Sequence, residues 1–222
     1  MPQPSPRSIL LAGATGLVGR ELLARLTGDS RCGDLHVWLR RPVAGLASGP
    51  KRSVRQVDFD ALPPAPPGLT DACIALGTTI KVAGSKEAFR RVDHHCVLGV
   101  AKAARAAGAQ HIAVVSAAGS DARSRIFYNR VKGEMEDAVA ALGYASVIFA
   151  QPSLLLGDRT ALDQPLRAGE VWAMRLLGPL FPFVPRAVRP IAASAVAAAL
   201  VEALFDARPG VRGLSSGEMQ PS

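Results

Sequence analysis

Short apolar runs alternate with amphipathic segments along most of this chain. Runs of strand length cover residues 8–12, 35–39, 54–59, 71–79, 111–119, 146–150 and 213–219, some with the loop at the strand's end. Apolar residues at intervals of three and four predict helices over residues 17–26, 86–107, 128–142 and 193–205. Strands that alternate with helices in this way predict a doubly wound parallel sheet in one α/β domain. That domain spans residues 1–222 and carries a small C-terminal lobe, mainly residues 152–190 and 207–222.

The first strand leads directly into three evenly spaced glycines, Gly13, Gly16 and Gly19. The first glycine permits a sharp turn, the second lets the backbone approach a ligand, and the third lets the helix pack closely on the strand. Free N–H groups and a partial positive charge at the N-terminus of the helix suit a pyrophosphate. The segment therefore predicts a dinucleotide site that is formed by Gly13, Ala14, Thr15, Gly16, Leu17 and Val18.

The ends of the next three strands add candidate contacts to this ligand. Arg40 and Arg41 stand where an acidic residue would hold the ribose hydroxyls and where an arginine favours a 2′-phosphate, so the chain is expected to prefer NADP(H) to NAD(H). Asp58, beside Phe59, either accepts from the adenine amino group or forms a turn before the prolines that follow. Backbone and hydroxyl groups at the end of the fourth strand come from Leu76, Gly77, Thr78 and Thr79.

A tyrosine and a lysine follow the fifth strand on one helical segment. Tyr128 and Lys132 are four residues apart, so they share a helical face. An ammonium group near a phenol favours the phenolate, which suits Tyr128 to act as general acid or base toward a carbonyl or alcohol. Ser116, at the end of the fifth strand, can hold the same oxygen. Ser116, Tyr128 and Lys132 are therefore the predicted catalytic residues.

Composition limits the partners and the compartment. The net charge is +8, but the arginines are scattered and no aromatic residues are interleaved with them, so nucleic acid is not an expected partner. Cys32, Cys73 and Cys96 are widely spaced, which predicts neither a disulfide framework nor a zinc site and favours a reducing, cytoplasmic compartment. The neighbours His94 and His95 point in different directions from a helix, so no metal site is expected. No signal peptide and no membrane span are expected either.

Together these motifs make the chain resemble the short-chain dehydrogenase/reductase superfamily. It is most similar to the atypical branch that contains the HIV Tat-interacting oxidoreductase and its bacterial relatives. The resemblance covers about residues 9–190. It is carried by the motifs Gly13–Gly19, Arg40–Arg41, Leu76–Thr79, Phe89–Asp93 and Tyr128–Glu134.

The resemblance implies a Rossmann fold, NADP(H) as the cofactor, and roles for the catalytic residues. Tyr128 is then the proton donor or acceptor, Lys132 binds the nicotinamide ribose, and Ser116 orients the substrate oxygen. Pro152 leaves the sheet over the nicotinamide site. Two positions depart from the family pattern. Relatives often carry a second serine where this chain has Ala117, which makes Ser120 a rival for the catalytic serine, and they often carry an arginine where this chain has Gln151.

The sequence thus predicts NADP(H)-dependent hydride transfer to or from a small carbonyl or alcohol substrate. The first alternative is an enzyme of the sugar-nucleotide epimerase or dehydratase type, and the second is a non-catalytic protein that senses NADP(H). A short helix over residues 169–177 and a proline-rich apolar segment over residues 178–190 form either a substrate lid or a packed connector. The helices at residues 86–107 and 128–142 can pair across a homodimer.

Overall fold

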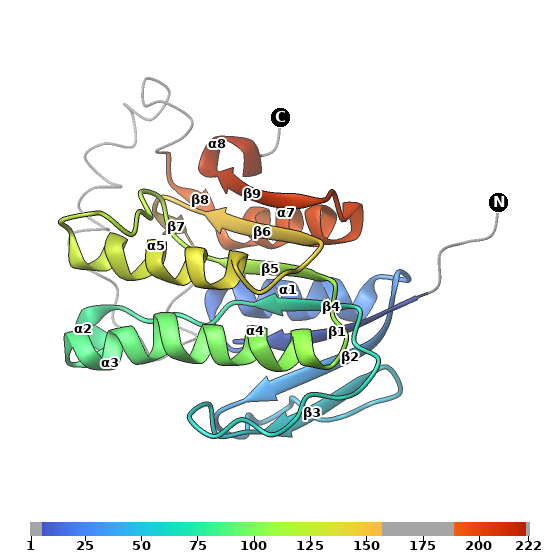
Figure 1. Cartoon of the computed structure of the whole chain (residues 1–222). Coiled ribbons are helices and arrows are strands. Elements are labelled where there is room, and N and C mark those ends of the chain that lie inside the picture. The colour runs from blue at the N-terminus through green and yellow to red at the C-terminus, as the bar shows by residue number, and fades with distance from the viewer. Residues whose placement is uncertain (1–5, 157–188, 221–222) are drawn as a thin grey trace.

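The computed structural model describes residues 6–156 and 189–220, and its centre is a sheet of parallel strands (Figure 1). Along the sheet the strand order is β3-β2-β1-β4-β5-β6-β9, and every pair is parallel. A separate parallel pair joins β7 to β8. The bounds are β1 (Arg7–Ala12), β2 (Cys32–Leu39), β3 (Arg52–Gln56), β4 (Asp71–Ile74), β5 (His111–Val115), β6 (Ser146–Gln151), β7 (Leu155–Leu156), β8 (Ile191–Ala192) and β9 (Gly210–Ser215). The predicted doubly wound, Rossmann-type fold is confirmed.

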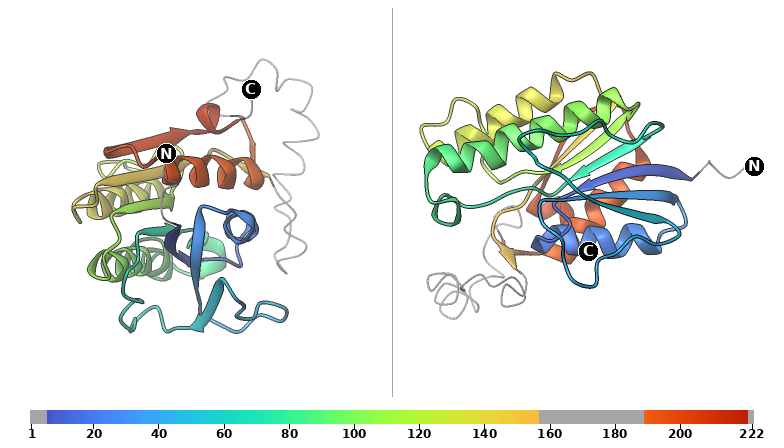
Figure 2. Two further views of the ribbon diagram at one scale, coloured as in Figure 1. Left: turned by 90° about the vertical axis from the view of Figure 1, so that its right-hand side faces the viewer. Right: turned by 90° about the horizontal axis from the view of Figure 1, so that it is seen from below.

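Helices cover both faces of this sheet, as the view from below shows (Figure 2). The bounds are α1 (Leu17–Gly28), α2 (Ile80–Ala83), α3 (Lys86–Arg90), the π-helical turn η1 (Arg91–Cys96), α4 (Val97–Ala106), α5 (Phe127–Ala140), α7 (Ala193–Asp206) and α8 (Ser216–Met219). One face carries α1 and α7, and the other carries α4 and α5, which pack against each other within the chain. Of the helices in the described ranges, none is long and apolar enough to cross a membrane.

The central strand shows why the apolar runs are continuous. Ile9 and Leu11 belong to the core under α1 and α7, whereas Leu10 and Ala12 belong to the core under α4 and α5. All four side chains are fully buried. A parallel strand between two helical layers has no solvent-facing side, so every position favours an apolar residue.

Three predicted elements differ from the structure. The expected helix over residues 86–107 is present but includes the π-helical turn η1, which apolar spacing does not reveal. The third strand ends at Gln56, because Asp58 accepts the N–H of Asp60 and turns the chain. The last strand ends at Ser215, because Ser215 and Glu218 form a reciprocal capping box that starts α8. The predicted helix at residues 169–177, and nearly all of the 178–190 segment, lie outside the described residues.

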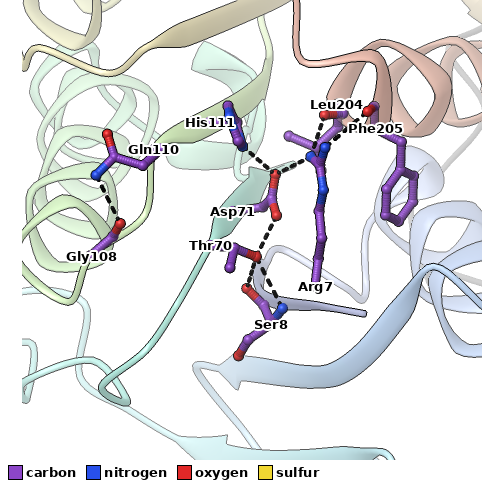
Figure 3. A network of polar contacts seen from close by, with 9 residues as sticks. All are labelled: Arg7, Ser8, Thr70, Asp71, Gly108, Gln110, His111, Leu204 and Phe205. Carbon is purple, nitrogen blue, oxygen red and sulfur yellow. Dashed lines mark hydrogen bonds and ion pairs between the residues drawn. The ribbon is translucent and has the colours of Figure 1, made fainter. Parts of the chain in front are cut away.

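A polar network joins the strands at the amino edge of the sheet (Figure 3). Asp71, fully buried at the start of β4, accepts from Arg7 at 2.9 Å and from Thr70 at 2.5 Å, and it lies 3.0 Å from Nδ1 of His111. Arg7 also donates to two carbonyl oxygens at the end of α7, at 2.8 and 2.9 Å. The network therefore ties β1, β4 and β5 to α7 and leaves the opposite, carboxyl edge free for other uses.

Candidate functional site

A groove of about 1100 Å³ lies at the carboxyl edge of the sheet. The loops that follow β1, β2, β3 and β4 all contribute to it, and the strand order reverses between β1 and β4. In open α/β sheets this crevice is where ligands bind. Among the residues predicted to bind a dinucleotide, those that line the groove are Gly13, Ala14, Thr15, Gly16, Arg40, Asp58, Phe59, Leu76, Gly77 and Thr78.

The glycine turn forms the groove's end wall. Gly13 has a φ of +90°, and a Cβ there would lie 2.4 Å from the carbonyl carbon of Ala75. A Cβ on Gly19 would lie 1.9 Å from the oxygen of Gly13, so the start of α1 is packed directly on the turn. Gly16 is the N-cap residue and has no side chain to accept from the first N–H groups of α1. These N–H groups and the helix dipole therefore suit an anionic ligand.

Six predicted contacts are not among the described residues that line the groove: Leu17, Val18, Arg41, Thr79, Lys132 and Pro152. For three of them the structure shows a local reason. Val18 is buried in the core under α1. The hydroxyl of Thr79 accepts the N–H of Val82 at 3.1 Å and caps α2. Pro152 is buried, and its carbonyl accepts the N–H of Ala118 at 3.0 Å.

Three further arginines line the groove beside Arg40, namely Arg20, Arg52 and Arg91. Asp58 and Asp60 are the carboxylates in the same lining, so cations outnumber anions there. Arg20 follows the glycine turn within the first turn of α1, a position that the motif itself could have indicated. Arg91 comes from the π-helical turn, and although it stands in the Phe89–Asp93 motif, no position in that motif indicated a groove contact.

Tyr128 and Lys132 lie on α5, but their surroundings differ. The Tyr128 ring is partly buried and packs against Phe89, with 5.2 Å between the ring centroids. The Lys132 side chain is only 3% exposed, and its Nζ lies 2.8 Å from Oδ1 of Asp93, which is 1% exposed. Burial is the largest influence on Asp93 and raises the pKa of its carboxyl group, whereas the Lys132 ammonium favours the ionised form. No residue pattern in the sequence indicates this partnership of Asp93 with Lys132.

Both candidate serines meet at the end of β5. The Oγ atoms of Ser116 and Ser120 lie 3.0 Å apart, and Ser120 donates to the carbonyl oxygen of Ala117 at 2.7 Å. Ser116 is buried, while Ser120 is partly exposed. A Cβ on Gly133 would lie 2.2 Å from the backbone nitrogen of Ala122, so α5 packs directly on this serine loop. The two candidate serines are therefore a hydrogen-bonded pair, and the structure does not favour one over the other.

Gln151, where relatives often have arginine, is bound to α5. Its amide donates to both carboxylate oxygens of Glu136, at 3.1 and 2.9 Å. The side chain thus connects the end of β6 to the helix that carries Tyr128.

Comparison with curated proteins shows clear relatives, although no family model matches the chain. Protein fmp52 of Emericella nidulans is 32% identical over 162 residues, which cover 68% of this chain and 68% of that protein. Protein FMP52 of Lodderomyces elongisporus is 32% identical over 178 residues, which cover 76% of this chain and 74% of that protein.

The names of these relatives overturn one prediction. Both are described as mitochondrial, so the cytoplasmic compartment expected from the cysteines is wrong. Three free, buried thiols indicate a reducing environment, and this is a redox property that does not identify a compartment.

Solved structures share the fold at low sequence identity. The Bordetella bronchiseptica enzyme WbmF, in complex with NAD⁺, matches with a TM-score of 0.66 and 13% identity, over 96% of this chain and 76% of that one. A UDP-glucose 4-epimerase from Thermotoga maritima, with UDP-glucose, matches with a TM-score of 0.66 and 10% identity, over 95% of this chain and 77% of that one. These matches show a Rossmann-like fold and do not distinguish the Tat-interacting branch.

Proposed function

This chain belongs to the Fmp52 family of proteins, and we propose that it is an NADP(H)-dependent oxidoreductase of the short-chain dehydrogenase type. Its substrate is a small carbonyl or alcohol compound, and Tyr128 is its acid/base residue. The resemblance to the branch of the Tat-interacting oxidoreductase supports the same activity. The names of the relatives support a mitochondrial location.

One observation carries the proposal, namely the open groove at the N-terminus of α1. The groove is lined by a glycine turn in which a Cβ on Gly13 or Gly19 would meet backbone, and α1 begins there with no side-chain cap. We assign the pyrophosphate to these N–H groups and the adenosine to the part of the groove that Arg40, Asp58 and Phe59 line.

The preference for NADP(H) rests on the charge of the groove. Arg40 follows β2, the strand whose end faces the adenosine ribose in this fold. With Arg20, Arg52 and Arg91 in the same lining, a 2′-phosphate would find several guanidinium donors. Arg41 is not among the lining residues, so Arg40 is the better candidate for this contact.

The reaction at the substrate oxygen is assigned to residues of the chain itself. A bound nicotinamide ring would supply or accept the hydride at the substrate carbon. Tyr128 gives its phenolic proton to the carbonyl oxygen, or takes it back from the alcohol. The linked hydroxyls of Ser116 and Ser120 hold that oxygen, with Ser120 the more exposed of the two. Lys132 contributes positive charge from the same helix.

Sugar-nucleotide epimerisation remains the second candidate because a UDP-glucose 4-epimerase shares the fold. Its chain is longer, since this chain covers 77% of it. A protein that senses NADP(H) without turnover is the third candidate. It requires the cofactor groove but not Tyr128.

Calorimetric titration with NADPH and NADH, followed by a screen of carbonyl substrates, tests the proposal. Wild type is expected to bind NADPH more tightly than NADH and to oxidise it in the presence of a carbonyl compound. Tyr128→Phe should keep NADPH affinity and lose turnover by about a hundredfold or more, since it removes the acid/base group. Unchanged turnover in this variant would remove the assigned mechanism. Binding without turnover in wild type would favour the sensor. Binding of neither NADPH nor NADH would refute both the oxidoreductase and the sensor.

A further inference from the structure

Lys132 and Asp93 form a buried ion pair directly behind the groove. The pair joins α5 to η1 at 2.8 Å, with side chains that are 3% and 1% exposed. A Cβ on Gly77 would lie 3.4 Å from Oδ1 of Asp93 and 4.0 Å from Nζ of Lys132. Because Gly77 lines the groove, a single backbone segment separates the pair from a ligand there.

The same carboxylate also holds the groove wall. Its second oxygen, Oδ2, accepts the backbone N–H of Thr78 at 2.8 Å. Thr78 lines the groove just beyond β4. Asp93 therefore fixes a wall segment with one oxygen and the predicted ribose-binding lysine with the other.

A π-helical turn brings Asp93 to this position. It interrupts the helical run between α3 and α4, and such insertions occur frequently at functional sites. The same turn contributes Arg91, Val92 and Cys96 to the groove lining. One local distortion thus provides part of the groove and the carboxylate behind it.

The charged groups around Asp93 leave Lys132 as its counter-ion. From α5 the facing cation is Lys132, and from the β4 loop the facing group is the uncharged amide of Thr78. On its own turn, Arg91 pairs with Asp60, while His94 lies near Arg90 and Glu134. A buried ammonium without a counter-charge is strongly disfavoured. The position of Lys132 therefore depends on Asp93.

We propose that Asp93 is a positioning residue of the cofactor site, which holds the Lys132 ammonium and the Thr78 backbone against the Gly77 wall of the groove. This inference rests on the proposed function, because it assumes that the groove takes a nicotinamide dinucleotide. Asp93 acts through Lys132 and the wall and touches no reacting atom.

Asp93→Asn tests this role with little change in shape. The amide oxygen can still accept from Thr78, whereas the charge that holds Lys132 is gone. NADPH affinity, measured by calorimetry on folded protein, is expected to fall about tenfold or more at unchanged stoichiometry. The same variant should also lower kcat, since Tyr128 lies one turn from Lys132 on α5.

Asp71→Asn is the matched control, because Asp71 is a fully buried, ion-paired aspartate at the opposite edge of the sheet. It should lose stability and keep the NADPH affinity of wild type. A merely structural role of Asp93 would make the two variants alike, with NADPH affinity within about threefold of wild type. That result would overturn the proposal.

A double variant covers the case in which Asp93→Asn does not fold. Asp93→Asn/Lys132→Met removes both buried charges, a change that proteins often tolerate. If Asp93 acts through Lys132, the double variant should bind NADPH no more weakly than Lys132→Met alone. A further loss of about tenfold would contradict this coupling.

The two proposals can fail separately. Wild type that binds NADPH without turnover overturns the oxidoreductase function, and the affinities above still decide the role of Asp93. Wild type that turns over carbonyl compounds, together with unchanged affinity in Asp93→Asn, overturns only the role of Asp93.

Discussion

Two buried aspartates lie at opposite edges of the same sheet, and they are bound in different ways. Asp71, at the start of β4, is fully buried and contacts Arg7, Thr70 and His111 (Figure 3). Asp93, on the turn η1 beyond the carboxyl end of β4, is 1% exposed and contacts Lys132 and the amide of Thr78. The first carboxylate is surrounded by the ends of three strands, whereas the second lies behind an open groove.

From this difference we expect Asp71 to contribute mainly to the stability of the fold and Asp93 mainly to ligand binding in the groove. At the amino edge Asp71 binds Arg7, which also donates to the end of α7, so this contact also fixes the fold. At the carboxyl edge the partners of Asp93 come from a groove wall and from the helix of Tyr128. Substitutions at the two edges should therefore change different measurable quantities.

The largest expected effect is on stability at the amino edge. Asp71→Ala leaves the Arg7 guanidinium without its carboxylate, and the free energy of unfolding should fall by about 3 kcal/mol. Urea unfolding measures the loss, and NADPH affinity of the folded fraction should not change. As a control, Asp121→Ala removes an exposed carboxylate beside Arg123 and should cost no more than about 0.5 kcal/mol. Equal losses in both variants would contradict the role of the Asp71 network.

Sequence alone predicted most of the sheet, because its strands are buried on both faces and therefore appear as apolar runs. The predicted helices at residues 128–142 and 193–205 match α5 and α7 within one or two residues at each end. Contacts between distant residues were not predictable in this way. Arg7 and Asp71 are 64 residues apart, and neither the arginine nor the aspartate stands in a recognisable motif.

At the carboxyl edge the next largest effect is on binding. Gly16→Ala places a methyl group 3.6 Å from the nearest described atom, the oxygen of Gly13, so the fold should tolerate it. The methyl group projects from the residue that caps α1, where the pyrophosphate is proposed to lie. NADPH affinity should therefore fall about tenfold or more, which is about 1.4 kcal/mol, while the free energy of unfolding changes little.

Two further glycine variants serve as controls for Gly16→Ala. Gly28→Ala, at the other end of α1, has no atom within 4 Å of the added methyl group, so it should leave NADPH affinity unchanged and should not destabilise the fold. Gly13→Ala should destabilise the fold as well, because its φ is +90° and the methyl group meets backbone at 2.4 Å. An unaltered NADPH affinity in Gly16→Ala would place the pyrophosphate elsewhere.

A smaller effect should distinguish two neighbouring arginines. Arg40 lines the groove and Arg41 does not, although both side chains are exposed. Arg40→Ala should weaken NADPH binding by about tenfold, as expected for the loss of a charge-assisted contact to phosphate. NADH affinity should stay the same, and Arg41→Ala should leave both affinities unchanged. Equal weakening of NADPH and NADH in Arg40→Ala would contradict a 2′-phosphate contact.

The candidate site could be predicted in part, because its motifs are local. The glycine turn, Arg40, and the end of β4 line the groove as the spacing indicated. Asp93 lay inside a recognised motif, but its partnership with Lys132 depends on a π-helical turn that side-chain periodicity does not encode.

The smallest effect returns to the amino edge and depends on pH. Arg31 stacks over the same Phe205 ring as Arg7, at 4.2 Å, and its hydrogen bonds to Asp29 hold the pKa of that carboxyl group below its ordinary value of 3.8. A depressed pKa in the folded state means that the stabilisation is present above pH 3.8 and is lost as the pH falls through the lower folded value.

Asp29→Asn should therefore reduce the free energy of unfolding by about 0.5 kcal/mol near neutral pH, since Arg31 is partly exposed and solvent screens the pair. Urea unfolding of wild type and variant, repeated from neutral pH down to well below pH 3.8, should show the two curves converging at the acid end. A difference that persists there would mean that the asparagine disturbs packing rather than removing a charge. A difference of several kcal/mol near neutral pH would show that the amino edge depends on this exposed pair as much as on the buried Asp71.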